Sequence, residues 1–210
     1  MIFLQKQNKM IERLQEMGIS DQNVLEAMRR VPRHMFVRQG LEHQSYDEKA
    51  LPIGFDQTIS HPYTVAVMTQ ALDIKKNDKI LEIGTGSGYQ AAVLCEMGAQ
   101  VFTVEKIPEL GQNADRMLRS LGYHYALRIG DGTLGWQNYA PYNAIIVTAG
   151  APVIPENLMT QLKPEGRLLI PVGTQQEQVL TLHIRTEDGY RKFELEKLRF
   201  VPLVGKQGWK

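Results

Sequence analysis

Residues 81–89 read Leu81-Glu82-Ile83-Gly84-Thr85-Gly86-Ser87-Gly88-Tyr89, an apolar strand that runs into three alternating glycines. The apolar residues 80–83 predict a buried parallel strand, and residues 90–97 predict the helix that leaves the turn. Open α/β sheets bind ligands at the carboxyl ends of such strands, where glycines let the backbone come close to the ligand. The stretch therefore predicts an α/β fold with a nucleotide-like ligand at this turn.

The spacing of the glycines indicates which ligand this is. A dinucleotide site of the G-x-G-x-x-G type needs its third glycine at position 89, which is Tyr89, whereas Gly88 comes one residue early. The pattern E/D-x-G-x-G-x-G, which starts here at Glu82, resembles the first motif of the Rossmann-like methyltransferases. That resemblance implies S-adenosylmethionine as cofactor, with S-adenosylhomocysteine as product. The alternative is a glycine-rich turn without a ligand.

The rest of a nucleoside site is expected at the ends of the next two strands. Residues 100–104 form an apolar run that ends in Glu105, about 20 residues after the glycines, where an acidic side chain reaches a ribose in Rossmann-type sites. The predicted strand 125–129 leads into Gly130-Asp131-Gly132. Asp131 is expected to accept from the adenine amino group, and Gly132 to leave room for the ring. Alternatively, Glu105 is solvated and residues 131–132 form an Asp-Gly turn.

The chain is expected to form one domain, with a helical N-terminal part at 1–72 that binds substrate and an α/β body at 73–210 that binds cofactor. Helices are predicted at 2–17, at 21–30 with Ser20 as its cap, and at 61–72, while 39–60 has no clear period. Strands are predicted at 79–83, 100–104, 125–129, 142–148, 167–172, 179–185 and 193–203. This predicts a Rossmann-like class I methyltransferase fold, with a seven-stranded, mostly parallel, doubly wound sheet and an N-terminal helical extension.

Composition narrows the functional class. The net charge is +1 and no Lys/Arg-rich run is present, so we expect neither a nucleic-acid nor a membrane partner. No signal-peptide core and no run of about 18 apolar residues is found, which predicts a cytoplasmic protein. With Cys95 alone, an internal disulfide is impossible, and a buried thiol is expected. A monomer is the default expectation, and no metal site is predicted.

The acceptor of the methyl group is narrowed by motifs that the chain lacks. Enzymes of this fold that methylate amino groups of nucleic acids carry [D/N]-P-P-[Y/F] after the fourth strand, where this chain has Thr148-Ala149-Gly150-Ala151-Pro152. Methylation of cytosine C5 needs a Pro-Cys dipeptide, which is absent. A carboxylate is already ionised at neutral pH and needs no general base. A carboxylate acceptor therefore fits a chain without an obvious base.

Residues 50–62, Ala-Leu-Pro-Ile-Gly-Phe-Asp-Gln-Thr-Ile-Ser-His-Pro, resemble the substrate and active-site region of the protein-L-isoaspartate O-methyltransferases. The resemblance extends over nearly the whole chain and includes residues 81–89, 130–136, 142–149, 171–173 and 199–203. It implies an enzyme that methylates the free α-carboxylate of isoaspartyl residues in damaged proteins and peptides. The ester then closes to a succinimide, and hydrolysis of the succinimide regenerates aspartate.

The resemblance also assigns residues. Ser60 matches the active-site serine, expected to orient the substrate carboxylate by a hydrogen bond, and Thr58 and Ile59 match positions that line the substrate pocket. The implied cofactor-binding residues are Ile59, Ser60, Glu82, Gly84, Thr85, Gly86, Gly88, Glu105, Lys106, Asp131, Gly132 and Thr148. His61 and Gly150 depart from the family pattern, and residues after Leu203 match less well.

Other interpretations of the same residues stay open. Without the resemblance, Ser60 is typical of a helix cap, and its neighbour His61 suggests a Ser-His hydrolase, although no G-x-S-x-G elbow is present. A small-molecule methyltransferase would share the glycine loop but lack the block at 51–62. A binding module would keep both and not turn over, and a nicotinamide dehydrogenase would need a glycine at position 89.

Overall fold

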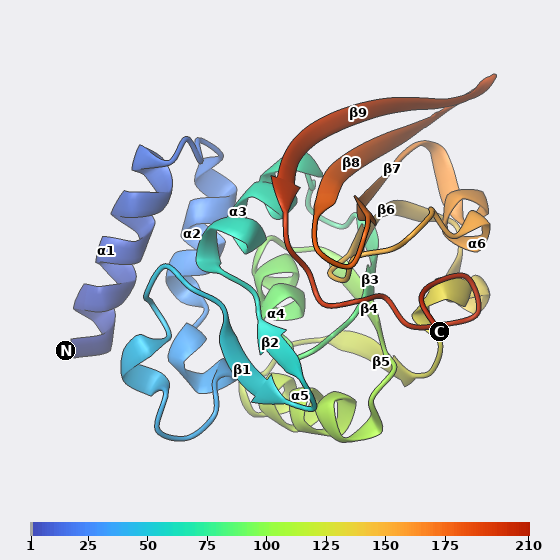
Figure 1. Ribbon diagram of the computed structural model, residues 1–210. Coiled ribbons are helices and arrows are strands. Elements are labelled where there is room, and N and C mark those ends of the chain that lie inside the picture. Colours follow the sequence, from blue (N-terminus) through green and yellow to red (C-terminus); the bar gives the residue numbers. More distant parts are fainter. Residues whose placement is uncertain (1) are drawn as a thin grey trace.

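The computed structural model describes residues 2–210 and is built around a seven-stranded sheet (Figure 1). In spatial order the strands are β5 (Tyr125–Ile129), β4 (Gln100–Glu105), β3 (Lys79–Ile83), β6 (Tyr142–Val147), β7 (Leu162–Gly173), β8 (Gln178–Thr186) and β9 (Gly189–Leu198). The first five are parallel, and β8 and β9 pair antiparallel. The predicted mostly parallel, seven-stranded sheet is confirmed.

The strand order places a ligand-binding edge. β3 lies between β4 and β6, so the chain leaves β3 toward one side of the sheet and later returns to its other side. Ligands bind at such a topological switch point, beyond the carboxyl ends of the strands. The glycine loop follows β3, Glu105 ends β4, and Thr148 follows β6. Three segments that are far apart in the sequence thus meet at one edge.

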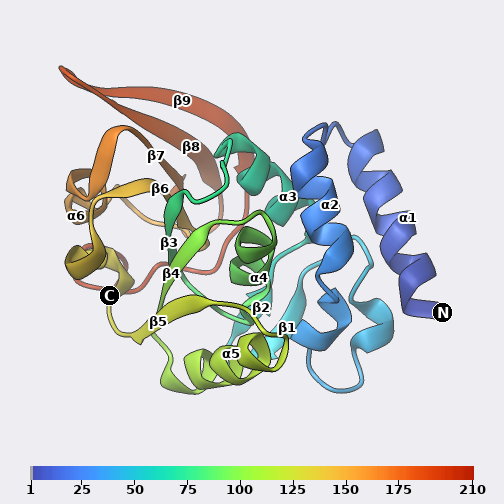
Figure 2. The same cartoon turned by 180° about the vertical axis from the view of Figure 1, so that it is seen from behind.

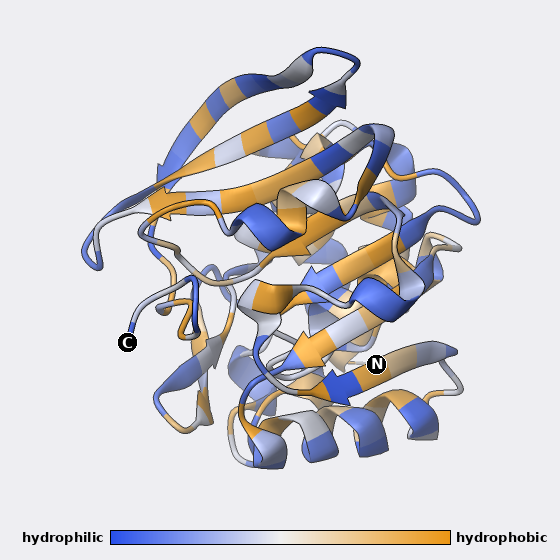
Figure 3. Cartoon of the chain, turned by 90° about the vertical axis from the view of Figure 1, so that its right-hand side faces the viewer, coloured by the Kyte–Doolittle hydropathy of each residue, from blue (hydrophilic) through white to orange (hydrophobic). Residues whose placement is uncertain are grey.

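Hydrophobic residues cover both faces of the sheet. Side chains such as Ile80 and Ala144 face the core shared with the N-terminal helices and α4 (Tyr89–Glu96), whereas Leu81 and Ile145 face a second core near α6 (Glu156–Thr160). Figure 2 shows α4 between the sheet and the N-terminal helices. Strands buried on both faces are apolar nearly throughout, as the central strands are in Figure 3, while the long β8–β9 hairpin alternates in hydropathy.

The N-terminal helices are α1 (Ile2–Glu16), α2 (Gln22–Arg30) and α3 (Pro62–Ala71), close to the predicted ranges; α5 (Pro108–Ser120) joins β4 to β5. The prediction that Ser20 caps α2 is wrong. Asp21 takes this place because its carboxylate accepts from the N–H groups of Asn23 and Val24. Among residues 2–210, no helix combines the length and the apolar character that a membrane crossing requires.

Residues 39–60 are more ordered than the missing periodicity predicted. They contain the 3₁₀ helix Glu42–Gln44 and a hairpin of β1 (Leu51–Gly54) and β2 (Gln57–Ile59). Its two-residue turn, Phe55 and Asp56, has φ of 53° and 55°, as a hairpin turn with the twist of its strands requires. This turn was not predicted from the sequence because neither of its two residues is glycine or asparagine.

The last predicted strand, 193–203, is wrong at its C-terminal end. β9 ends at Leu198, and the apolar residues that follow leave the sheet. Gly150 N–H donates to the Val201 carbonyl, and Leu203 N–H donates to the Gly150 carbonyl, both at 2.8 Å. The apolar run at 200–203 therefore does not continue the β9 ladder but packs along the loop after β6, while Phe200 N–H still donates to the Gln178 side chain at the start of β8, at 2.8 Å.

Candidate active site

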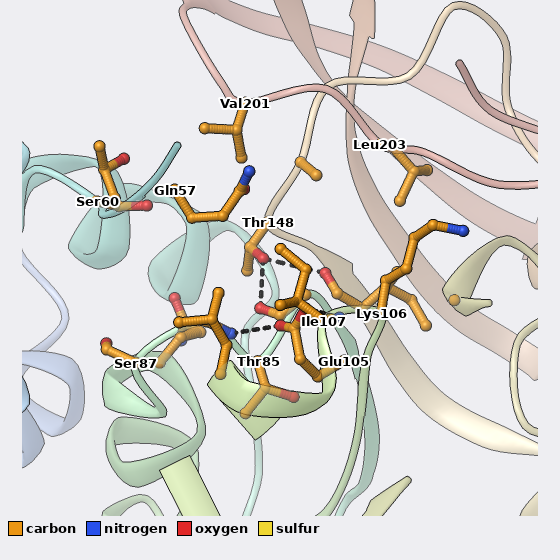
Figure 4. A pocket seen from close by; sticks show the side chains of 18 of the residues that line it. Gln57, Ser60, Thr85, Ser87, Glu105, Lys106, Ile107, Thr148, Val201 and Leu203 are labelled. Atoms are coloured by element: carbon orange, nitrogen blue, oxygen red, sulfur yellow. Dashed lines mark hydrogen bonds between the residues drawn. The ribbon is translucent and has the colours of Figure 1, made fainter. Parts of the chain in front are cut away.

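A cavity of about 370 Å³ lies at the switch-point edge of the sheet (Figure 4). Its walls come from the glycine loop, the residues that follow β4 and β6, the β2–α3 junction and the C-terminal tail. Figure 4 shows Gln57 and Ser60 on one side, with Glu105 and Lys106 on the other. The polar lining residues are Gln57, Thr58, Ser60, Thr85, Ser87, Gln90, Glu105, Lys106 and Thr148.

The glycine loop is shaped by left-handed backbone and by Thr148. Gly84 and Gly86 have φ of 94° and 54°, a region that residues with a Cβ rarely adopt. A Cβ on Gly84 would lie 2.4 Å from the Thr148 hydroxyl. That hydroxyl contacts the carbonyls of Ile83 and Gly84, at 3.0 and 2.7 Å. Thr148 thus holds the loop from the end of β6, in a conformation that exposes its backbone to the cavity.

Glu105 is buried at the end of β4 and joins two parts of the wall. Its Oε2 accepts from Gly86 N–H at 2.8 Å, and its Oε1 accepts from Ile107 N–H at 2.9 Å. Each carboxylate oxygen has a second lone pair, so the side chain can still accept hydroxyl groups from the cavity. Its contact with the glycine loop ties the expected ribose position to the turn over which the cofactor is expected to pass.

Glu82 lies beneath the loop and does not line the cavity. Its Oε2 accepts from the Thr103 hydroxyl at 2.5 Å, and Thr103 in turn lies 2.6 Å from the Thr85 hydroxyl. Because Thr103 donates to Glu82, Thr85 is the donor to Thr103. Burial raises the pKa of Glu82 to about 8, so the neutral acid predominates at pH 7. Glu82 is therefore linked to the cavity only indirectly, through the hydrogen bonds from Thr103 to Glu82 and from Thr85 to Thr103.

Gly88 and Asp131 also lie outside the lining of the cavity. Gly88 has φ of 88° and is the N-cap that directly precedes α4, and an added Cβ would approach Ala114 and Leu118 of α5 to 3.3 Å. Asp131 accepts from the Thr133 N–H and hydroxyl through Oδ1 and from Lys206 N–H through Oδ2. The Asp-Gly turn of the alternative interpretation is thus formed, and it holds the C-terminal tail. The contact of Asp131 with adenine stays a prediction.

Thr58, Ile59 and Ser60, at the β2–α3 junction, line the cavity. The interpretation of Ser60 as a helix cap is wrong, because α3 is capped by His61, whose Nδ1 accepts from Tyr63 N–H at 3.0 Å. Burial, followed by the charge of Arg33, lowers the pKa of His61, so the ring is neutral at pH 7 and its Nδ1 is free to accept. Ser60 thus precedes the helix and faces the cavity.

The C-terminal tail was missed as a wall of the site. Val201, Pro202, Leu203 and Val204 line the cavity, and the Trp209 indole N–H donates to the Gly150 carbonyl at 3.0 Å. Gly150 is tightly packed, since a Cβ there would lie 2.8 Å from the Gln178 side chain. The apolar run at 200–203 was the available signal, and a strand explained it equally well. The tail therefore adds four apolar side chains to the wall of the cavity.

The residues fit the cofactor that the glycine motif predicts. The loop presents its backbone at Gly84, where a Cβ would collide with Thr148, and Glu105 keeps free acceptor capacity beside the loop. Gly132, at the far end, has room for no Cβ, because one would lie 2.4 Å from Ile83. Of the predicted cofactor residues, nine line the cavity: Ile59, Ser60, Gly84, Thr85, Gly86, Glu105, Lys106, Gly132 and Thr148. Such a cavity can bind an adenosine-bearing ligand and hold a second molecule at Ser60.

Comparisons with known proteins agree with this geometry. The model of the family described as Protein-L-isoaspartate(D-aspartate) O-methyltransferase matches residues 5–208. Protein-L-isoaspartate O-methyltransferase 1 of Syntrophobacter fumaroxidans is 51% identical over 99% of this chain and 98% of its own. The protein-L-isoaspartate O-methyltransferase of Dictyoglomus thermophilum is 50% identical over 98% of this chain and 94% of its own.

Solved structures share the fold. A protein-L-isoaspartate O-methyltransferase matches 96% of this chain and 67% of its own, with a TM-score of 0.87 at 27% identity. A Plasmodium falciparum protein, described as a beta-aspartate methyltransferase and solved with S-adenosyl-L-homocysteine, matches 94% of this chain and 98% of its own, with a TM-score of 0.82 at 23% identity. The chain therefore belongs to the protein-L-isoaspartate (D-aspartate) O-methyltransferase family and is an S-adenosylmethionine-dependent methyltransferase of isoaspartyl residues.

Proposed function

We propose that Ser60 is the catalytic residue of this methyltransferase, and that Thr58, Ile59 and Ser60 hold the free α-carboxylate of an L-isoaspartyl residue. The observation that supports the proposal most directly is that Ser60 and the glycine loop line the same cavity, while His61 caps α3 in place of Ser60. The serine hydroxyl is thereby left to serve a substrate.

The reaction needs orientation and exclusion of water more than acid-base chemistry. S-adenosylmethionine, when bound, supplies a methyl group on a cationic sulfur. Ser60 donates a hydrogen bond to one carboxylate oxygen and directs the other oxygen, already ionised, at the methyl carbon. Apolar side chains, among them Ile59 and Leu203, remove the water that would solvate the carboxylate. A cationic clamp on the carboxylate would weaken the nucleophile, so a hydroxyl suits this role better.

The steps that follow methyl transfer need no group of the enzyme. Methyl transfer converts the carboxylate into a methyl ester. The backbone nitrogen that follows the residue attacks the ester carbonyl, expels methanol and closes a succinimide. Addition of water to the succinimide gives an aspartyl or an isoaspartyl residue, and the latter is methylated again. Repeated cycles accumulate the aspartyl form.

The cofactor is held by two sets of residues in this proposal. The nine predicted residues that line the cavity contact the cofactor directly, with Glu105 on the ribose. Glu82, Gly88 and Asp131 act from behind the lining: Glu82 through Thr85, Gly88 by allowing α4 to pack on α5, and Asp131 by holding the tail in addition to its predicted contact with adenine. We assign substrate binding to residues 1–72 and cofactor binding to residues 73–210, within one domain.

The proposal also covers the oligomeric state, the compartment and the partners of the protein. The protein acts as a monomer in the cytoplasm on isoaspartyl-containing proteins and peptides, without a nucleic-acid partner. A net charge of +1 offers little attraction to polyanions, and Cys95, the single cysteine, is partly buried, which suits a reducing compartment. Sedimentation of the purified protein at catalytic concentrations tests the monomer.

The test of the reaction uses methyl-tritiated S-adenosylmethionine with an isoaspartyl peptide and its aspartyl twin. The isoaspartyl peptide should be labelled, and mild alkali should release the label as volatile methanol, because the product is an ester. A succinimide, lighter than the starting acid by one water, should appear in the mass spectrum. Alkali-stable label, or equal labelling of both peptides, would overturn the proposal in favour of an amino or small-molecule acceptor.

A further inference from the structure

Arg33 is a fully buried cation that the reaction scheme does not use. It begins the 3₁₀ helix Arg33–Phe36, directly after the Pro32 that follows α2, and none of its surface is exposed. Arginine is rarely buried completely unless an acidic group pairs with it. Among the ion pairs of residues 2–210, none includes Arg33. A cation in this position therefore calls for a role other than a salt bridge.

The guanidinium group contacts two backbone carbonyls and one aromatic ring. Its Nε donates to the Ser45 carbonyl and its Nη2 to the Ser60 carbonyl, each at 2.6 Å. Its Cζ lies 4.6 Å from the centre of the Tyr89 ring. Burial lowers the pKa of Arg33, yet the guanidinium stays protonated because its ordinary pKa is so high. The cost of burying this charge is thus offset by the dipoles of the Ser45 and Ser60 carbonyls and by the π face of Tyr89.

These contacts bridge the two halves of the site. Ser60 lies on the acceptor side, and Tyr89 is the first residue of α4, directly after the glycine loop. Tyr89 also lines the cavity and is 1% exposed, whereas Arg33 does not line the cavity. Arg33 therefore cannot clamp the acceptor carboxylate itself. It is placed to fix the backbone of Ser60 relative to the helix that carries the cofactor loop.

We propose that Arg33 is a positioning residue for methyl transfer, which holds the Ser60 carbonyl against the Tyr89 end of α4 and so sets the place of the Ser60 hydroxyl. The inference rests on the proposed role of Ser60. A planar, forked donor is needed, because two carbonyls and a ring face have to be engaged at once. Keeping the charge behind the backbone also leaves the acceptor carboxylate free of a competing cation.

The first test is Arg33→Lys, which keeps the charge but loses the fork and the planar stack. We expect kcat on an isoaspartyl peptide to fall at least about tenfold, since a displacement near 1 Å is costly in rate. The Kd of S-adenosylhomocysteine, measured by calorimetry, should change less than about twofold. Arg30→Lys is the matched control: its side chain is 60% exposed and pairs with Glu26 at the end of α2, so kcat should be unchanged.

A double-mutant cycle with Ser60→Ala separates positioning from a loss of stability. If Arg33 acts through the Ser60 hydroxyl, Arg33→Lys should lower kcat in the wild type but change it less than about twofold once the hydroxyl is gone. An equal effect in both backgrounds, or a wild-type kcat in Arg33→Lys, would overturn the inference. A wild-type kcat in Ser60→Ala would instead overturn the proposed role of Ser60. Thermal unfolding confirms that the lysine variant is folded, and Arg33→Gln, neutral but forked at its amide, replaces it in the cycle if it is not.

Discussion

Replacement of Glu105 by alanine is expected to weaken the binding of S-adenosylhomocysteine while the fold is kept. The carboxylate is 5% exposed and accepts one backbone N–H on each oxygen, from Gly86 and Ile107, which leaves one lone pair on each for ribose hydroxyls. A hydrogen bond to a charged group contributes about 1.5–3 kcal/mol. Loss of one such bond corresponds to an increase in Kd of about 10- to 150-fold.

Titration calorimetry with S-adenosylhomocysteine measures this increase for Glu105→Ala and Glu105→Gln. The glutamine variant keeps the shape but turns one acceptor into a donor, which then faces the N–H of Gly86 or Ile107, so it should bind as weakly as the alanine variant. Glu109→Gln is the control, because Glu109 is exposed in the first turn of α5 and lies outside the cavity lining. A Kd for Glu105→Ala within about twofold of the wild type would refute the ribose assignment.

Three further changes test other parts of the site. Ser60→Ala should lower kcat on an isoaspartyl peptide and leave the Kd of S-adenosylhomocysteine nearly unchanged. Ser60→Gly should not restore turnover, because His61 and not Ser60 caps α3. Recovery of kcat in the glycine variant would show that the serine has a structural role. The free energy of unfolding should fall by up to about 1.4 kcal/mol per pH unit as pH rises from about 4.5 to 8, because the unfolded state has lost the Glu82 proton that the folded state keeps. Urea unfolding across this range should show a weaker pH dependence in Glu82→Gln, and an unchanged slope would contradict the neutral acid. Gly84→Ala should lower the free energy of unfolding by about 1–3 kcal/mol, because φ is 94° and the new Cβ would meet the Thr148 hydroxyl; thermal unfolding of Gly122→Ala, with φ of 78° but open space around it, gives the cost of φ alone.

The candidate site shows which residues local pattern was able to identify. The glycine loop and Glu105 were predicted because they lie at the carboxyl ends of strands that are largely buried and therefore mostly apolar. Thr148 was assigned only by the resemblance to the family. Parallel strands place their carboxyl ends at one edge, so the residues after them meet there whatever the loops do. The assignment of Ser60 needed more than pattern: its neighbourhood resembles a known family, and on local grounds a helix cap was the better interpretation.

By itself, the sequence determined the seven-stranded, mostly parallel sheet and the cofactor loop, since alternating strands and helices and a glycine spacing are local properties of the chain. Tertiary structure alone decided four features. The pairing of Leu51 with Ile59 forces Phe55 and Asp56 into a hairpin turn. The tail is held at the cavity because Asp131 accepts a hydrogen bond from Lys206 N–H. Burial keeps Glu82 neutral at pH 7. Arg33 donates a hydrogen bond to the carbonyl of Ser60, 27 residues further along the chain. Each of these features depends on neighbours distant in sequence, and no periodicity or spacing within a segment records which distant groups will desolvate a charge or accept its hydrogen bonds.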